Sequence, residues 1–397
     1  MLNFRRSQSA ELWQEDGTLN AFVISRRRLA LGSTALLAAP HIALAADPIR
    51  IGCVFPSTGP AAEAGSFQLN GARLALAQVN EKGVLGRPME LVVEDDQTTN
   101  PGAVLAFSRL SAQRDIAAFI GSIRSTQVDA MAPDVLKIGK PMMIGGTSPT
   151  LTRMGNPWLF RCRPNDSYSG KVIAEYGVTD LKKQKWAVVY STDAFGSNGA
   201  KALEEALKAK GITPVLMQGY TNQASDYTAV VLAVRQSGAD ILGSYFTFEN
   251  DLGIFARQVR QLGVRIPWVG SPSITNTTAL SLAGPALHGT YGVADFAVDA
   301  TPASKDFAQR YEAAHRKAAD NQSSWTFDAV NLLALAINTA GSTEPDKIRT
   351  ALLGIRGYAG AEGEYNFDAN GDGLRGYNIV RNDAGKIVFI RRIDIQE

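Results

Sequence analysis

The sequence predicts an α/β protein of two Rossmann-like lobes, each with a parallel sheet covered by helices. Short apolar runs rich in β-branched residues alternate with longer helical patterns, which is typical of βαβ units. This alternation occurs in two successive series, divided near Asn165 and Asp166. The length of 397 residues also fits two domains, at roughly 100–200 residues each.

The expected strands are apolar runs bounded by Gly, Pro or polar residues, as in strands buried on both faces. They are Ile49–Phe55, Met89–Glu94, Ile116–Gly121 and Pro141–Ile144 in the first series, and Trp186–Tyr190, Thr213–Gln218, Ile241–Phe246, Ile266–Val269 and His288–Phe296 afterwards.

The expected helices lie between these strands. They are Ser66–Glu81, Gly102–Arg114, Ser125–Ile138, Tyr168–Leu181, Gly196–Lys210, Asp226–Gln236 and Asn250–Leu262. The last of them has an apolar stripe at Leu252, Phe255, Ala256, Val259 and Leu262, the spacing of one helix face.

The rhythm changes after Val269. Three helices in succession are expected at Pro302–Ala319, Ser323–Ala340 and near Asp346–Leu353, followed by a β-hairpin of Gly376–Arg381 and Lys386–Ile393. Long helices need a sheet to cover, and the first lobe has room for them. We therefore expect the chain to cross between the lobes more than once.

The start of the chain has the pattern of an export signal. Ser25-Arg26-Arg27-Arg28-Leu29 precedes an apolar stretch that ends in Ala43-Leu44-Ala45. This order is that of a secretory signal, and the paired arginines resemble the twin-arginine type. We expect residues 1–45 to be removed, and no Cys follows the cleavage point to carry a lipid. The mature protein is then expected to be soluble and periplasmic.

Composition excludes several classes of function. Residues 1–45 hold five of the 40 basic and three of the 38 acidic side chains, so the rest of the chain carries 35 of each. A neutral chain lacks the basic surface of a nucleic-acid-binding protein. With three His and no G-x-S-x-G, G-x-G-x-x-G or Walker lysine motif, we expect no enzyme and no cofactor.

Two further motifs have structural interpretations. Asp368-Ala369-Asn370-Gly371-Asp372-Gly373 matches the first half of a calcium loop, but Ile379 stands where the loop needs Glu. We interpret it as a polar turn and expect no metal. Cys53 and Cys162 both lie in apolar runs; we favour two buried thiols, with a disulfide as the alternative.

Small polar loops follow several of the expected strands, at the edge where open α/β sheets bind ligands. They are Pro56–Pro60, Ser122–Thr126, Gly145–Pro149 and Ser191–Gly196. Hydroxyls and free helix N–H groups can hold an anion there, although simple helix capping would use the same residues.

These segments resemble, in order, the leucine/isoleucine/valine-binding family of periplasmic solute-binding proteins. The similarity covers nearly all of 48–395. The matching runs include Ile49–Gly52, Ser57–Pro60, Asn70–Ala72, Val79–Arg87, Glu94–Thr98, Phe119–Ser122, Thr147–Thr152, Phe160–Pro164, Asp193–Gly196 and Phe367–Asp372.

The resemblance implies a type I periplasmic-binding-protein fold with a three-strand hinge. It places lobe 1 at 46–165 plus 293–367 and lobe 2 at 166–292 plus 368–397. It also implies a monomer that binds a small molecule and delivers it to the permease subunits of an ABC importer. A periplasmic sensor that presents its ligand-bound form to a receptor is the alternative.

The resemblance places the ligand carboxylate at Ser125, Gly146 and Thr147. Phe195 covers the ligand, with Thr247 and Phe248 beside it.

The chain departs from the family at two places in the expected site. Ser271 belongs to a run, Gly270–Ser273, in which the family's acid for a ligand ammonium is missing, and Arg124 precedes Ser125. We therefore expect a ligand with a carboxylate, either an amino acid or an aromatic or keto acid, and Arg124 as a contact. The alternative is that Arg124 points to solvent or pairs with Asp129.

The export motif generates the first testable prediction. Replacing Arg26 and Arg27 together by Lys should block export through the twin-arginine route, because that signal is read by a receptor. Cell fractionation measures the outcome. Normal appearance of the double variant in the periplasm would instead indicate a general secretion signal.

Overall fold

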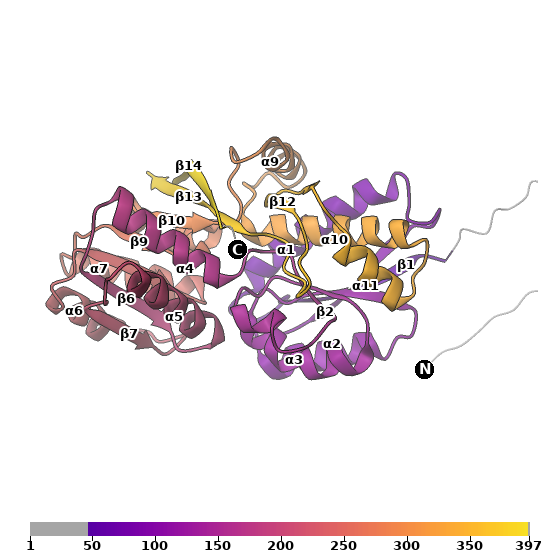
Figure 1. Cartoon of the computed structure of the whole chain (residues 1–397), viewed down its shortest axis with the longest axis horizontal. Coiled ribbons are helices and arrows are strands. Elements are labelled where there is room, and N and C mark those ends of the chain that lie inside the picture. The colour runs from indigo at the N-terminus through magenta and orange to yellow at the C-terminus, as the bar shows by residue number, and fades with distance from the viewer. Residues whose placement is uncertain (1–46, 396–397) are drawn as a thin grey trace, which may run out of the picture. The chain divides into compact units, whose positions relative to one another are not determined.

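The computed structural model describes residues 47–395 (Figure 1). The expected export signal at 1–45 lies outside this range. Two larger sheets form the framework, and they confirm the predicted α/β fold with two lobes. No helix among the described residues is both long enough and apolar enough to cross a bilayer.

The first sheet is entirely parallel. Its order is β2 (Met89–Asp95), β1 (Ile49–Phe55), β3 (Ile116–Ile120), β4 (Met142–Ile144) and β5 (Leu159–Arg161). The sequence did not reveal β5, which has only three residues and is too short to show a period.

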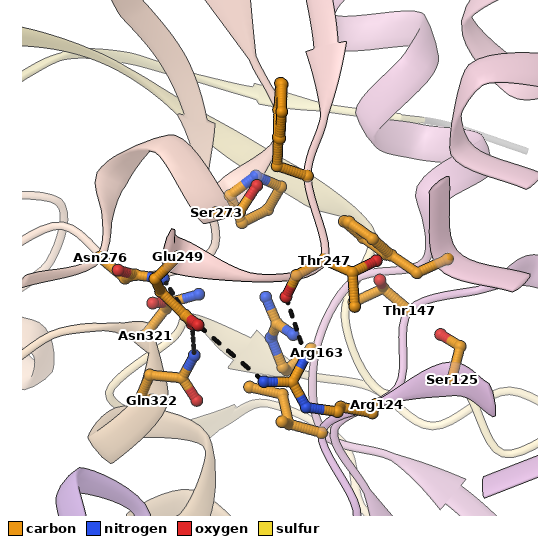
Figure 2. Close-up of a pocket in the computed structure, with 14 residues that line it drawn as sticks. Arg124, Ser125, Thr147, Arg163, Thr247, Glu249, Ser273, Asn276, Asn321 and Gln322 are labelled. Carbon is orange, nitrogen blue, oxygen red and sulfur yellow. Dashed lines mark hydrogen bonds and ion pairs between the residues drawn. The ribbon is translucent and has the colours of Figure 1, made fainter. Parts of the chain in front are cut away.

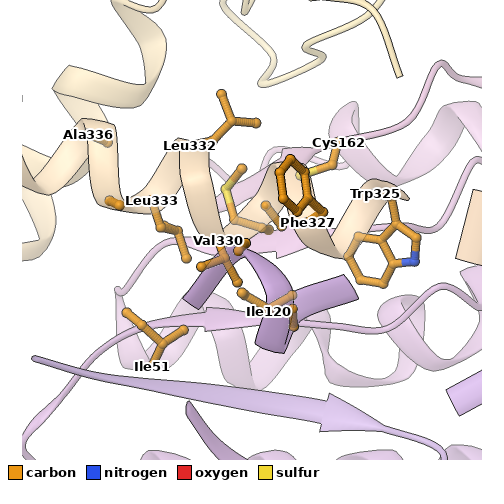
Figure 3. Packing of buried hydrophobic residues seen from close by; sticks show 14 of the residues in the cluster. Ile51, Ile120, Cys162, Trp325, Phe327, Val330, Leu332, Leu333 and Ala336 are labelled. Atoms are coloured by element: carbon orange, nitrogen blue, oxygen red, sulfur yellow. The ribbon is translucent and has the colours of Figure 1, made fainter. Parts of the chain in front are cut away.

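Helices cover both faces of this sheet. One face holds α1 (Ala62–Asn80), α9 (Pro302–His315), α10 (Asn321–Ala340) and α11 (Pro345–Leu353), and the other holds α2 (Asn100–Ser111) and α3 (Ser125–Ile138). In Figure 3, Trp325, Val330 and Leu333 of α10 point toward Ile51 and Ile120 of the sheet. The three late helices therefore return to the first lobe, as expected.

The second sheet is mixed. Its order is β14 (Lys386–Asp394), β13 (Gly376–Asp383), β10 (Tyr291–Ala294), β9 (Trp268–Gly270), β8 (Ile241–Tyr245), β6 (Trp186–Ser191) and β7 (Leu216–Tyr220). Strands β13 and β14 run antiparallel to their neighbours, as the predicted hairpin requires.

Five helices cover the second sheet. On one face lie α4 (Asp166–Glu175) and α5 (Ala194–Ala209), and on the other α6 (Thr228–Gln236), α7 (Glu249–Gln261) and α8 (Thr277–Ala283). The apolar stripe of α7 is buried at Leu252, Phe255, Ala256 and Val259. A pair of two-residue strands, β11 (Tyr358–Ala359) and β12 (Glu364–Tyr365), and the short helix α8 were not predicted.

The chain passes between the two sheets three times. It leaves β5 for α4, returns after β10 to pack Phe296 in the first core, and leaves again after Leu374, which also lies in that core. The lobe boundaries given above remain a prediction.

The cysteine and calcium-loop motifs both have structural roles. Cys53 and Cys162 are free and buried in the first core, and burial raises the pKa of both thiols. Asp372 of the loop accepts a hydrogen bond from Arg161 at 2.7 Å and another from Arg153 at 2.6 Å. Across residues 47–395, no group of three or more His, Cys, Asp or Glu side chains could hold a metal ion.

The Arg161–Asp372 pair generates a stability prediction. Neither side chain has more than 1% exposure, and despite burial the two arginines lower the pKa of Asp372 to about 2. Asp372→Asn should lower the free energy of unfolding by about 3–5 kcal/mol, because it leaves a buried guanidinium without its counter-ion. Urea denaturation at neutral pH measures the loss.

A matched control is Glu205→Gln, which breaks the exposed pair with Lys201 and should change stability by less than about 0.5 kcal/mol. The contribution of Asp372 should persist above pH ~4 and disappear as the pH falls towards 2, since its pKa is lower in the folded state. Equal losses for both variants would contradict the assignment.

Candidate functional site

The candidate site is a small cavity where both lobes contribute loops. Its volume is about 50 Å³. The first lobe supplies Ile123, Arg124, Ser125, Thr147, Arg163, Asn321 and Gln322, and the second supplies Phe195, Phe246, Thr247, Glu249, Pro272, Ser273 and Asn276. Figure 2 shows these side chains converging from the two sides.

Ser125 and Thr147 form the hydroxyl side of the cavity. Ser125 is the first residue of α3, directly after the loop that follows β3. Its hydroxyl oxygen accepts a hydrogen bond from the Ser148 N–H at 3.1 Å, so its proton remains available. Thr147 is hydrogen-bonded to Asp166, whose pKa burial raises to about 6. The helix start and the free proton of Ser125 suit an anionic group.

Gly146 does not line the cavity but lies behind the side formed by Ser125 and Thr147. Its carbonyl accepts from Arg161 at 2.9 Å. A Cβ on it would come within 2.8 Å of Leu151 Cδ1 and 3.2 Å of the Ser125 Cα. The glycine therefore allows the loop after β4 to approach the start of α3.

Glu249 is the acid of the site, and the sequence analysis missed it. It begins α7 and is buried. Its Oε1 accepts hydrogen bonds from Asn276 at 3.1 Å and Gln322 at 3.4 Å. The run Gly270–Ser273 has no acid, as expected. Glu249 supplies a carboxylate to the cavity from another position, and an acid at a helix start after β8 was the signal.

Arg124 is buried, so the alternative of a solvent-facing side chain or a pair with Asp129 is wrong. Its guanidinium donates to the Thr247 carbonyl at 2.9 Å and lies 3.9 Å from a Glu249 oxygen. It also lies over the Phe248 ring, 4.2 Å from the centroid. Phe248 therefore contacts the site through Arg124 rather than lining the cavity.

Two other residues expected in the site lie at different depths relative to the cavity. Phe195 lines the cavity, is only partly buried and packs edge-on against Tyr245 at 5.8 Å. Ser271 is fully buried and shares a hydrogen bond of 2.8 Å with Ser273, which does line the cavity. Ser271 thus supports the wall from behind.

The cavity also contains a second guanidinium. Arg163 pairs with the buried Asp295 and donates to the Gly145 carbonyl at 3.0 Å. The cavity lining thus contains two guanidinium groups, Arg124 and Arg163, and one carboxylate, Glu249. Sequence reasoning missed Arg163 because it follows β5, a strand that the sequence did not reveal. It missed Asn321 and Gln322 because they belong to the start of α10 rather than to a strand-end loop.

Comparison with known proteins finds similar sequences among periplasmic binding proteins. The sequence pattern of the periplasmic binding protein family matches residues 48–386. A Leu/Ile/Val-binding protein of Rhizobium johnstonii is 30% identical over 353 residues, which cover 87% of this chain and 94% of that protein. A leucine-specific-binding protein of Salmonella typhimurium is 27% identical over 338 residues, or 84% and 89% of the two chains.

Solved structures share the fold. A leucine-binding protein from Thermotoga maritima superposes with a TM-score of 0.82 at 22% identity, covering 87% of this chain and 99% of that one. A solute-binding protein of an ABC transporter from R. palustris, in complex with benzoate, gives 0.80 at 19% identity, covering 87% and 96%.

The two phenylalanines of the cavity generate a third prediction. Phe246 is 1% exposed and stacks on Tyr220 at 4.8 Å, whereas Phe195 is partly exposed. Phe246→Ala should lower the free energy of unfolding by about 3–5 kcal/mol, as core Phe deletions do. Phe195→Ala should cost about 1 kcal/mol or less, measured by urea denaturation without ligand. Equal losses would mark Phe195 as a core residue.

Proposed function

Because the chain belongs to the periplasmic binding protein family, we propose that it is the extracytoplasmic solute-binding component of an ABC importer and that its ligand is an α-amino acid. The relatives named for leucine, isoleucine and valine support this ligand class. In this proposal the ligand lies between the lobes and favours their closed arrangement. The permease subunits then recognise the closed form.

One observation supports the amino acid most directly. Figure 2 places the Glu249 carboxylate on one side of the cavity and the hydroxyls of Ser125 and Thr147 on the other. A zwitterion has a cationic and an anionic group that match these two sides. An aromatic or keto acid has no cationic group for Glu249.

The remaining lining suits an apolar side chain. Ile123, Phe195, Phe246 and Pro272 contribute carbon surface between the two polar sides. Burying an aliphatic side chain there is favourable by roughly 1.5–3 kcal/mol. This argument favours leucine, isoleucine or valine over small polar amino acids.

A ligand screen by thermal unfolding tests the proposal. An amino acid at about 100 times its dissociation constant should stabilise the mature protein by about 2.7 kcal/mol. Leucine, isoleucine and valine should raise the melting temperature, whereas 4-methylpentanoate, which is leucine without its amino group, and benzoate should have much smaller effects. A response to the acids alone would overturn the amino-acid assignment.

Glu249→Gln is the matching variant. It keeps the shape of the side chain but removes its charge and replaces one acceptor oxygen by an NH2 donor, so affinity for the responding amino acid should fall at least tenfold by calorimetry. Affinity for 4-methylpentanoate should change little. Uptake of the labelled amino acid by cells with and without the gene separates transport from the sensor alternative.

A further inference from the structure

Arg124 connects the two lobes through the cavity. Its backbone caps α3 in the first lobe, and its guanidinium contacts Thr247, Phe248 and Glu249 of the second lobe. Figure 2 shows this side chain reaching across toward Glu249. The side chain is 8% exposed, so the guanidinium is held inside the site.

The partners of Arg124 are those that bind an ammonium group. A carbonyl oxygen, a carboxylate and an aromatic face each attract a cation, and together they form a cation subsite. In this structure the Arg124 guanidinium lies at this position.

The space left beside Arg124 is too small for an amino acid. A cavity of about 50 Å³ holds a few water molecules, whereas small-molecule sites have roughly 300–1,000 Å³. A ligand of the proposed class needs more room than this arrangement leaves, and movement of the guanidinium out of the cavity would supply part of it.

We infer that Arg124 occupies the subsite of the ligand's amino group in the ligand-free protein and that an amino acid binds by displacing it. This inference rests on the proposed function and adds a competitor within the chain. The exchange replaces one cation by another beside Glu249. A ligand without an amino group cannot make this exchange.

The contacts of Arg124 are incomplete, which favours displacement. Its distance of 3.9 Å from Glu249 is longer than a hydrogen bond, and its Nε has no hydrogen-bond partner although it is buried. Two amides, Asn276 and Gln322, hold the Glu249 carboxylate independently of Arg124. The acid therefore stays in place when the guanidinium leaves.

An internal competitor lowers the apparent affinity by the fraction of molecules in which the subsite is free. Arg124→Ala should therefore bind the amino acid roughly three- to tenfold more tightly than the natural protein, measured by calorimetry with leucine. Its affinity for 4-methylpentanoate should stay equal or fall. Arg109→Ala, which removes an exposed arginine paired with Glu94 outside the site, is the control and should change neither affinity.

Weaker leucine binding by Arg124→Ala, or the same change for leucine and 4-methylpentanoate, would overturn the inference and assign Arg124 to the ligand carboxylate. Failure of every amino acid to bind any variant would instead overturn the proposed function. Small-angle scattering of the protein without ligand is a separate test that needs no affinity measurement. Because Arg124 connects the lobes, Arg124→Ala should have a larger radius of gyration than the natural protein. Equal radii would contradict the role of Arg124 as a connection between the lobes.

Discussion

The buried guanidinium of Arg161 is the constraint on which the arrangement of the first lobe depends. With no solvent access, it must find its hydrogen-bond acceptors inside the protein. It finds them in the carbonyls of Gly146 and Ser148, in the Thr152 hydroxyl and in Asp372. One side chain therefore fixes the loop after β4, the end of β5 and the last crossing of the chain. The Thr147 wall of the cavity lies between two of these anchors.

Arg163 repeats this arrangement two residues later, where the chain crosses to the second lobe. It joins Asp295 of the second crossing to the Gly145 carbonyl, and it also lines the cavity. The crossing segments and the cavity thus share a residue, Arg163. In the proposed function, a ligand at this side of the cavity contacts a residue that holds two crossing segments together, and through it could bias the arrangement of the two lobes.

The sequence predicted what local pattern determines and missed what depends on distant packing. Continuous apolar runs and helical stripes predicted most elements. Strand-end position predicted the loops Ser122–Thr126 and Gly145–Pro149, and the family resemblance singled out Ser125 and Thr147 within them. The sequence could not predict Gln322 as a site residue. Gln322 lies at the start of α10, which follows another helix rather than a strand, so its position has no pattern that marks a site. Glu249 carried a signal, an acid directly after a buried strand, but the search for an acid covered only the neighbourhood of Pro272.

The position of Glu249 shows why the charges that line this cavity must be counted across both lobes. Taken with its sequence neighbours alone, Arg124 indicates an anion site, and an acid-free cavity would then favour a simple carboxylate. In the folded chain the same guanidinium faces an acid 125 residues away, and their charges cancel. Under the proposed function, this pair favours a ligand with a cationic as well as an anionic end. The pair exists only in the folded chain, because neither segment holds both charges.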